Sequence, residues 1–536
     1  MAKQQHHALL AEAEQIASQF DLSPDHVRGV TTHFVRQMKD GLENRRVWQL
    51  PAYVRSVPTG TETGEFLAVD LGGSNCRVCL VKLKGDSLFS VVQSKHSVPP
   101  SVMVNASYRP LFAFVAQKIS DFLAVHGGLT DGLPFKLGFT FSFTCEQTSL
   151  ASGRLIHWDK GWDIPDAIGR DPCVMLQEAI DELELPALVT VLANDSVGTL
   201  LTRSYATGPT TSTLGAIIFG TGTNAAYVEK LSNIGRLGVA ANEGDIMIIN
   251  TEWGCLDDKM EVLPRTPFDD ELDEASTDPG SQMFEKRVSG LYLGELLRLA
   301  ILQLVQLGLF DMNADEKSPI FRREGIDSSF LSSLAIAGAD VDSAIDLIKS
   351  TLNSESVSEP DAFAIQLLAT SIARRAARLA GASLAALIIR SGRLNPPKCD
   401  KSSERTTALA MWKPPRISNI TRFWHNINFL WRRFLNFIGK NSVLPKRSSL
   451  RISTSQYIPE PVTECPPRED GEVIDIGADG SLIEFYPSFE AEMRGAMREV
   501  SEIGLSGERR VRIGLAKDGS GVGAALMAQG VGVDID

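Results

Sequence analysis

The chain has 536 residues, of which 43% are hydrophobic and 22% are charged, and its formal net charge at pH 7 is -13. A chain of this length is expected to hold more than one domain, and its composition is that of an ordinary globular protein. The acidic balance argues against nucleic acid as a partner of the whole molecule.

The cysteines and the N-terminus indicate the compartment. The seven cysteines are scattered and odd in number, and we interpret them as reduced thiols. The N-terminal stretch is polar and acidic where a signal peptide would need an apolar centre. No run of apolar residues is long enough to predict a membrane-spanning helix. We therefore expect a cytoplasmic protein with no stable membrane association.

The first part of the chain alternates between helical and strand-like patterns. Residues 6–44 predict two amphipathic helices, with Ser23 as N-cap and Pro24 at the first position of the second helix. The elements expected next are strands at 66–70 and 76–83, a helix at 108–125, a strand at 136–143, a helix at 172–184 and a strand at 188–193. The alternation predicts an α/β architecture with largely buried strands.

A glycine loop follows the first of these strands. Residues 66–78, FLAVDLGGSNCRV, form an apolar run that ends on an acid, two glycines, a hydroxyl and an amide. A plain hairpin turn is one interpretation, and a loop whose backbone N–H groups face a phosphate is another. After Asn75 the chain returns into a strand, which argues against a Walker-type loop and a dinucleotide fingerprint, because both need a helix there.

The same pattern recurs about 150 residues later. Residues 214–229, LGAIIFGTGTNAAYVE, again read as a strand, a glycine loop and a returning strand. Two such units predict an internally duplicated α/β chain in which each half presents one loop.

The C-terminal half adds long helices and a third glycine-rich element. Helical periodicity covers 290–309 and 362–390, and the cluster of Arg374, Arg375 and Arg378 is typical of a solvated helix face. Residues 518–523, DGSGVG, lead into a helix whose N-terminus is suited to face an anion.

Taken together, nine segments resemble the hexokinase family, especially fungal-type glucokinases. In chain order they read FLAVDLGGSNCRV, LGFTFSFTCEQTSL, WDKGWDIP, LANDSVGTL, IFGTGTNAAY, INTEWG, GSQMFEKRVSGLYLGELLR, IGADGSLIEFYPSF and AKDGSGVGAAL. The resemblance implies a two-lobed fold of the actin-like ATPase superfamily, with internally duplicated β-sheet domains around a cleft. It also implies transfer of the ATP γ-phosphoryl group to the 6-hydroxyl of glucose or another hexose, the first step of glycolysis, with magnesium.

Family analogy also gives the domain boundaries. The expected parts are an N-terminal helical part of the large lobe at 1–68, a small lobe at 69–194 with a C-terminal helix at 522–536, and the rest of the large lobe at 195–521.

Phosphoryl transfer requires positioning, charge neutralisation and a base for the attacking hydroxyl. The resemblance makes Asp195 the general base, with Asn194 bonded to the sugar, and it gives Lys160 the role of offsetting charge on the transferring group. The alternative for Asp195 is that it only caps the helix that follows.

A polyhydroxylated sugar needs a hydrogen-bond partner for each buried hydroxyl. The positions that match the family's sugar-binding residues are Ser142, Asp159, Lys160, Asn194, Asp195, Asn224, Glu252 and Glu285. Read without the resemblance, Glu285 is one more charge on a helix surface and Ser142 is a hydroxyl at a strand end.

The glycine loops supply the expected nucleotide site. By resemblance, the phosphates lie near Asp70, Gly72, Gly73, Ser74, Asn75, Thr221 and Gly222, and the adenosine lies near Gly480, Ser481, Gly519, Ser520 and Gly521. We expect no metal held by the protein alone: Mg²⁺ arrives with ATP and keeps several waters, with Asp70 near it. Arg77 is interpreted as structural and is left outside the site.

Three residues depart from the family pattern. Ser74 stands where Thr is usual, which keeps the hydroxyl. Thr144 replaces a Pro after Ser142, which loosens the restraint on that turn. Asp159 stands where a sugar-binding Thr is usual, and an ionised carboxylate accepts hydrogen bonds but donates none.

Residues 394–470 interrupt the family pattern. Between Lys398 and Arg451 we count twelve Lys or Arg against Asp400 and Glu404, in an otherwise acidic chain. A basic, Trp-rich amphipathic helix at 420–438 that lies on an anionic membrane is one interpretation. Disorder, or a spurious segment from a mistaken gene model, is the interpretation we favour, because the pattern continues on both sides.

Two other functions compete with the kinase. One is a hexokinase-like sugar sensor with weak or no turnover, supported by Asp159 and Thr144. The other is an actin-like or chaperone ATPase, which shares the phosphate loops but has no use for the sugar-binding residues. Preference among glucose, fructose and mannose, and the oligomeric state, are left open.

Overall fold

The structure is a computed structural model of the chain, and it describes residues 2–73, 75–126, 134–158, 161–394, 452–456 and 472–530. The chain divides into two compact units, one made of Met1–Asn395 with Ile452–Asp536 and the other of Pro396–Arg451. All the described residues lie in the first unit.

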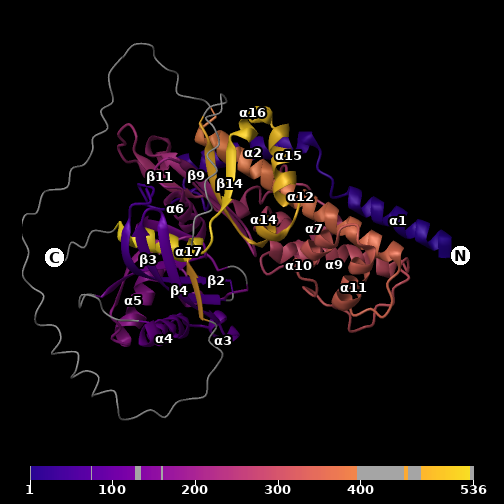
Figure 1. Ribbon diagram of the computed structural model, residues 1–536, viewed down its shortest axis with the longest axis horizontal. Helices are drawn as coiled ribbons and strands as arrows, with labels where there is room; N and C mark the ends of the chain where they lie inside the picture. The colour runs from indigo at the N-terminus through magenta and orange to yellow at the C-terminus, as the bar shows by residue number, and fades with distance from the viewer. Residues whose placement is uncertain are drawn as a thin grey trace, which may run out of the picture. The chain divides into compact units, whose positions relative to one another are not determined.

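This unit contains two six-stranded mixed sheets, and Figure 1 labels strands of both. The first sheet has, in spatial order, β12 (Ile452–Gln456), β4 (Leu88–Ser97), β3 (Asn75–Gly85), β2 (Thr63–Gly72), β5 (Phe135–Phe141) and β8 (Ala187–Ala193). The second has β1 (Leu50–Pro51), β11 (Ile246–Asn250), β10 (Thr223–Lys230), β9 (Thr213–Phe219), β13 (Ile474–Asp479) and β14 (Val511–Leu515). A short hairpin joins β6 (Cys145–Ser149) to β7 (Ser152–Leu155).

The two sheets repeat one topology, which confirms the predicted duplication. In the first sheet, β2, β3 and β4 form an antiparallel meander, and β2, β5 and β8 run parallel. In the second sheet, β9, β10 and β11 form the meander, and β9, β13 and β14 run parallel. Each predicted glycine loop is the tight turn of the first hairpin in its sheet, so the two loops occupy equivalent places.

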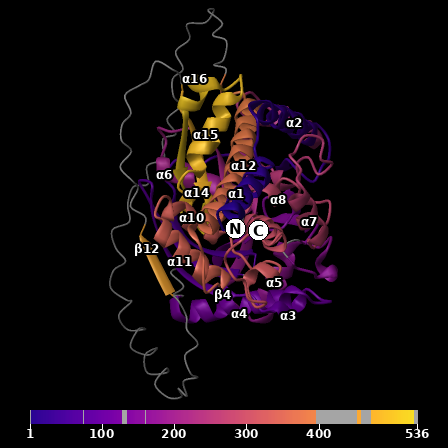
Figure 2. The ribbon, with the colours of Figure 1, turned by 90° about the vertical axis from the view of Figure 1, so that its right-hand side faces the viewer.

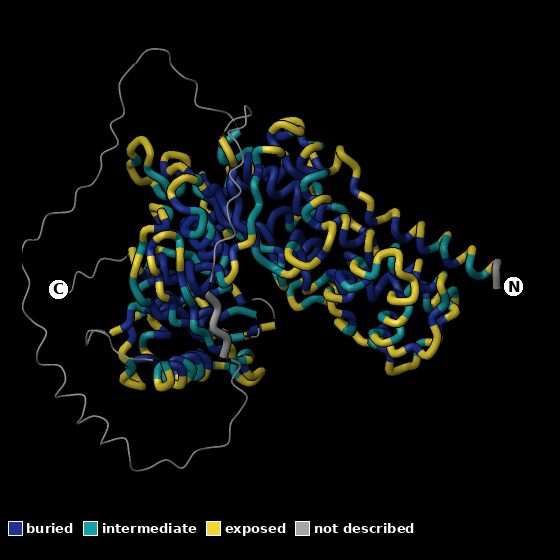
Figure 3. The backbone as a smooth tube through the Cα atoms, in the orientation of Figure 1, coloured by how far each residue is buried: buried dark blue, intermediate teal, exposed yellow. Residues whose placement is uncertain are grey.

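Helices cover the sheets. They are α1 (Ala2–Ser18), α2 (Pro24–Glu43), α3 (Pro100–Met103), α4 (Arg109–His126), α5 (Pro172–Glu182), α6 (Asp195–Thr207), α7 (Pro267–Ala275), α8 (Glu285–Val288), α9 (Gly290–Gln306), α10 (Ser329–Ala337), α11 (Val341–Leu352), α12 (Glu359–Ser391), α14 (Ser481–Phe485), α15 (Phe489–Glu499), α16 (Gly504–Arg509) and α17 (Gly519–Gln529). Figure 3 shows buried backbone running through the sheets, with the exposed positions mainly on loops and outer helix faces.

The N-terminal helices follow the sequence prediction. The Ser23 side chain accepts the N–H of His26 and Pro24 is the first residue of α2, so the predicted cap is present. The apolar stripes of both helices are buried, among them Leu9 and Ile16 of α1 and Val30 and Phe34 of α2. Burial of these stripes fixes both helices on the core.

Helix α17 packs against β2, β5 and β8 and crosses α6. The sequence placed this helix at 522–536, and it begins earlier, at Gly519. At the crossing, a Cβ on Gly523 would lie 2.1 Å from the Cα of Gly198, so the two backbones approach too closely for any side chain there. This contact places the start of α17 beside the start of α6.

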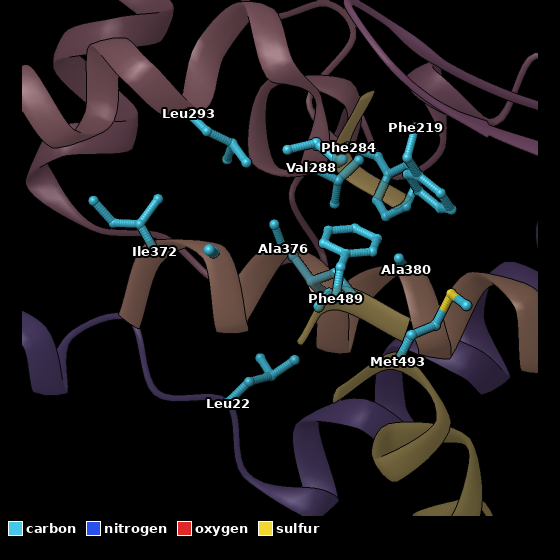
Figure 4. Packing of buried hydrophobic residues seen from close by; sticks show 14 of the residues in the cluster. Leu22, Phe219, Phe284, Val288, Leu293, Ile372, Ala376, Ala380, Phe489 and Met493 are labelled. Atoms are coloured by element: carbon cyan, nitrogen blue, oxygen red, sulfur yellow. The ribbon is translucent and has the colours of Figure 1, made fainter. Parts of the chain in front are cut away.

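Helix α12 is the centre of the larger core, and α15 lies along it (Figures 1 and 2). Figure 4 shows Ala376 and Ala380 of α12 beside Phe489, with Phe219 and Phe284 close to the same cluster. The prediction of a solvated arginine face on this helix is wrong for Arg375. Its guanidinium is buried and donates two hydrogen bonds of 2.7 Å to Asp269 of α7. Helix α12 is buried on several faces, so a cluster of arginines in its sequence does not by itself indicate a solvent-exposed face.

Part of the interruption at 394–470 is described. Residues Ile452–Gln456 form β12, which pairs antiparallel with β4 at the edge of the first sheet. The postulated helix at 420–438 lies outside the described residues, as does most of the interruption. Within the described ranges, no helix is long and apolar enough to cross a membrane.

Candidate active site

Strand β8 ends at Ala193, and the expected base and its neighbour follow at once. Asn194 is the N-cap of α6: its Oδ1 accepts the N–H of Ser196 at 2.9 Å and the Ser196 hydroxyl at 2.6 Å. Asp195 is the first residue of the helix, where the helix dipole stabilises a negative charge. The N-cap is therefore Asn194 and not Asp195, although Asp195 Oδ1 also accepts the N–H of Ser196 at 2.7 Å.

A chain of buried and partly buried hydrogen bonds connects three of the predicted sugar-binding residues, Asn194, Asn224 and Glu252. Asn224 Nδ2 donates to Asn194 Oδ1 at 3.3 Å and to Asn250 Oδ1 at 2.9 Å. Asn250 Nδ2 donates in turn to Glu252 Oε1 at 2.9 Å, and the N–H of Glu252 donates to Asn224 Oδ1 at 3.1 Å. Residues from the ends of β8, β10 and β11 thus form one network.

Glu285 joins this group from the start of α8. Its Oε2 accepts the N–H of Thr223, the residue before Asn224, at 2.8 Å. The loop after Glu252 packs tightly on the same segment, since a Cβ on Gly254 would lie 3.3 Å from the Cβ of Glu285. The interpretation of Glu285 as one more surface charge is wrong, because the residue is 8% exposed and bonded to the backbone next to Asn224.

We name residues 71–76, the turn between β2 and β3, the phosphate hairpin after its predicted role. Ser142 lies against it: the Ser142 N–H donates to the Leu71 carbonyl at 3.1 Å, and a Cβ on Gly72 would lie 2.8 Å from the Ser142 Cβ. Gly73 has a positive φ of 56°, with open space where a Cβ would be. Gly72 therefore lets Ser142 approach closely, and the open space beside Gly73 suits the predicted phosphate tail of a nucleotide.

Asp70 lies just before the hairpin and is buried against the start of α17. Its Oδ2 accepts hydrogen bonds from Arg77 Nη2 at 2.5 Å and from Ser520 Oγ at 2.8 Å. Thr140 Oγ1 donates a hydrogen bond of 2.9 Å to the Ser520 carbonyl, and Thr202 Oγ1 donates one of 3.1 Å to the Gly519 carbonyl. The hairpin and the third glycine element, which the sequence predicts to bind one nucleotide, are therefore adjacent.

The second glycine loop packs on the β13–α14 turn. The N–H of Leu291, near the start of α9, donates to the Thr221 carbonyl at 3.1 Å. Gly480 has a φ of 107°, and a Cβ there would lie 2.4 Å from the Phe219 carbonyl carbon. Burial raises the pKa of the preceding Asp479 to about 6, and the negative charge of Asp195 adds to the rise. The two predicted nucleotide loops of the second sheet thus meet near the expected base.

Three predicted residues, Ser74, Asp159 and Lys160, lie outside the described residues. The departure at Thr144 is described: the side chain is buried and the carbonyl accepts the N–H of Ile156 at 2.9 Å. No group of three or more His, Cys, Asp or Glu in the described ranges is arranged to hold a metal ion.

Comparison with known proteins gives the family. Family models described as Hexokinase match residues 12–205 and residues 214–411 with 451–529. The chain is 39% identical to a glucokinase of Aspergillus niger and 33% identical to glucokinase-1 of Saccharomyces cerevisiae, in each case over 97% of both chains. The chain belongs to the hexokinase family. A hexokinase of Schistosoma mansoni solved in complex with glucose shares 28% identity and a TM-score of 0.76, over 98% of this chain and 100% of its own.

These matches confirm the predicted family, the two-lobed hexokinase fold and the activity of an ATP-dependent hexokinase or glucokinase. Members of the hexokinase family use ATP as substrate. The roles of individual residues and the domain boundaries stay predictions. The second family match is interrupted at 412–450, within the segment that the sequence marked as atypical.

Sequence reasoning did not place Asn250 or Asp479 in the candidate site, and it did not pair Arg77 with Asp70. Asn250 stands two positions before Glu252 in the INTEWG segment and therefore on the same side of an extended chain, which is a usable signal. Arg77 was interpreted as structural, and its hydrogen bond to Asp70 is consistent with that; counting back from the Gly-Gly turn pairs the two residues. Asp479 lies in the IGADGS segment, but nothing local indicates its place near Asp195.

Proposed function

We propose that this hexokinase-family protein transfers the γ-phosphoryl group of ATP to the 6-hydroxyl of glucose, with Asp195 as general base. The 6-hydroxyl gives its proton to the Asp195 carboxylate as its oxygen forms a bond to the γ-phosphorus. The bond from that phosphorus to the β–γ bridging oxygen breaks, and ADP leaves. Mg²⁺ bound with ATP would neutralise phosphate charge near Asp70.

The observation that carries this proposal is the hydrogen-bond network from Asn194 through Asn224 and Asn250 to Glu252, with Asp195 next to its first member. It brings amide and carboxylate groups together, which suits a ligand rich in hydroxyls. An actin-like or chaperone ATPase has no use for such a group. Ser142 and Glu285 complete the proposed sugar-binding residues, with Asp159 and Lys160 expected from the resemblance.

The proposed nucleotide-binding residues are those of the three glycine elements. The phosphate hairpin and the loop at Thr221 and Gly222 would hold the phosphates, and the starts of α14 and α17 would hold the adenosine. Backbone N–H groups at the turns of the two loops proposed for the phosphates are suited to an anion. We further propose that the small lobe consists of residues 69–194 together with the C-terminal helix, and that the rest of the chain forms the large lobe. We also propose that the protein works in the cytoplasm.

The test is ATP-dependent phosphorylation of glucose, fructose and mannose by the purified protein, beside Asp195→Ala and the isosteric Asp195→Asn. Both variants are expected to lose about 10²- to 10⁴-fold in kcat, the usual contribution of a general base, and to keep glucose binding in calorimetry. Turnover by the variants within a few-fold of the parent would refute Asp195 as the base. A parent that binds glucose without turnover would instead establish the sensor.

A further inference from the structure

Two tryptophans bracket the segment in which the sequence places Asp159 and Lys160. Trp158 and Trp162 stack with ring centroids 5.5 Å apart and an interplanar angle of 14°, and Phe143 contacts both rings. Both indoles are buried, with 6% and 4% of their surfaces exposed. A buried indole N–H needs an acceptor, and the two rings differ in the acceptor that they use.

Trp158 bonds within its own loop, and Trp162 bonds outside it. Trp158 Nε1 donates to the carbonyl of Ile164, six residues away, at 2.9 Å. Trp162 Nε1 donates to the carbonyl of Gly73 in the phosphate hairpin, 89 residues away, at 2.5 Å. Gly73 has a left-handed backbone conformation. The direction of its carbonyl therefore depends on the geometry of this turn, which is the one proposed to bind the nucleotide phosphates.

Resting on the proposed phosphoryl-transfer function, we propose that Trp162 is a positioning residue for the nucleotide: its indole N–H fixes the Gly73 peptide of the phosphate hairpin. The hairpin then has two anchors in one segment of the chain, the Ser142 N–H to the Leu71 carbonyl and the Trp162 indole to the Gly73 carbonyl. Because Ser142 is a predicted sugar-binding residue, the same segment links the sugar side of the site to the phosphate side. Trp162 touches no reacting atom, and it acts through the hairpin.

The chain offers a matched pair of variants. Trp162→Phe and Trp158→Phe each keep an aromatic ring in the stack and remove one indole donor. Only the first removes a bond to the phosphate hairpin. For the full-length protein, the readouts are kcat, the KM for MgATP, the KM for glucose, and calorimetric binding of glucose and of the magnesium complex of a non-hydrolysable ATP analogue. Thermal unfolding of each variant measures the effect on the fold.

Trp162→Phe is expected to raise the KM for MgATP and the Kd of the analogue by about 3- to 10-fold, the range for loss of one hydrogen bond. The Kd for glucose should stay within about two-fold, and Trp158→Phe should leave both ligands within about two-fold. Equal effects of the two variants on nucleotide affinity, or unchanged affinity in Trp162→Phe, would overturn the inference. So would a loss of glucose and nucleotide binding in proportion to a lower Tm, because that pattern is purely structural.

The two proposals fail separately in this experiment. A parent that turns over normally while Trp162→Phe binds the analogue as the parent does refutes the role of Trp162 alone. A parent that binds the analogue but transfers no phosphate refutes the proposed function, and the analogue still tests Trp162. A parent that binds no nucleotide refutes both.

Discussion

Arg77 lies directly opposite Asp70 in the β2–β3 pairing, and its Nη2 donates a hydrogen bond of 2.5 Å to Oδ2 of Asp70. The negative charge of Asp70 raises the pKa of Arg77 above its ordinary value. Ser520 Oγ donates to the same oxygen at 2.8 Å. The carboxylate that we expect near the magnesium and the phosphates is therefore held by one donor from the next strand and one from α17.

Arg77→Met is expected to weaken nucleotide binding and to lower the free energy of unfolding by about 1–3 kcal/mol, because the buried Asp70 loses one of these two donors. The KM for MgATP and urea unfolding measure the two effects. Arg77→Lys serves as control, since an ammonium keeps the charge but lacks the planar fork of donors. Its KM for MgATP and its free energy of unfolding should lie between those of the parent and of Arg77→Met. Equal unfolding free energies of parent and Arg77→Met would show that the pair adds nothing.

Asn250 links Asn224 to Glu252, and this role can be tested by substitution. Asn250→Ala removes the acceptor of Asn224 and the donor to Glu252, so we expect the KM for glucose to rise about 10-fold. Asn250→Asp should be worse, because a carboxylate would then face the Glu252 carboxylate. Steady-state kinetics and calorimetry with glucose measure the change.

The control for these variants is Asn233→Ala. Asn233 Nδ2 also donates to a glutamate, Glu229 Oε1 at 2.7 Å, but it belongs to the short 3₁₀ turn Leu231–Asn233, outside the sugar-binding network. Its glucose KM should match that of the parent. If Asn250→Ala also matched the parent, the network would have no part in sugar binding.

Local sequence patterns were sufficient for the hairpins and for the duplication. A strand that stops at two glycines and returns can be read without tertiary information, and two such units fix two equivalent sheets. The pairing of Arg77 with Asp70 was within reach by counting register. The edge strand β12 was not predicted, because its position depends on pairing with β4 across more than 350 residues.

Burial on several sides was the main obstacle for the rest. Arg375 stands in a helix whose small residues pack against α1, α2 and α15, and no helical period tells such a helix from a surface one. Asp479 and Asp195 come close because the parallel strand β13 inserts beside β9, a crossover that neither segment encodes. These are long-range consequences of topology.

Asp258 gives a prediction for pH. Its Oδ1 accepts the Met283 N–H at 2.9 Å, and burial raises its pKa to about 6. Because this folded-state pKa lies above the unfolded value, the stabilisation from protonation is fully present at low pH and is lost as the pH rises through about 6. From pH 7 to pH 5, the parent should gain about 1 kcal/mol of unfolding free energy relative to Asp258→Asn, which does not titrate.

Urea unfolding at several pH values between 5 and 7 measures this difference. Asp258→Ala separates charge from hydrogen bonding, since it removes the acceptor of Met283 as well. Both variants should lack the pH step of the parent, and the Ala variant should in addition be less stable at every pH. A parent and an Asn variant that differ by a constant amount across the range would contradict the raised pKa.

Two adjacent arginines of α12 differ in burial, which allows a matched test of stability. Arg375 is buried, donates two hydrogen bonds of 2.7 Å to Asp269, and lies over the Phe20 ring at 4.8 Å from the ring centre. Its positive charge lowers the pKa of Asp269 against the opposing effect of burial. Arg375→Met leaves this carboxylate buried without its guanidinium, and removal of one partner of a buried pair typically costs about 3–5 kcal/mol.

Arg374→Met is the matched control, because Arg374 pairs with Asp21 at the surface and is 44% exposed. An exposed pair contributes about 0–1 kcal/mol, so this variant should unfold almost as the parent does. The two substitutions are the same and occupy neighbouring positions of one helix, so their difference compares a buried pair, together with its contact to Phe20, with an exposed pair. Urea unfolding of the three proteins measures it. Equal midpoints for the two variants would mean that Asp269 finds another partner or becomes protonated, and the buried pair would then not hold α7 against α12.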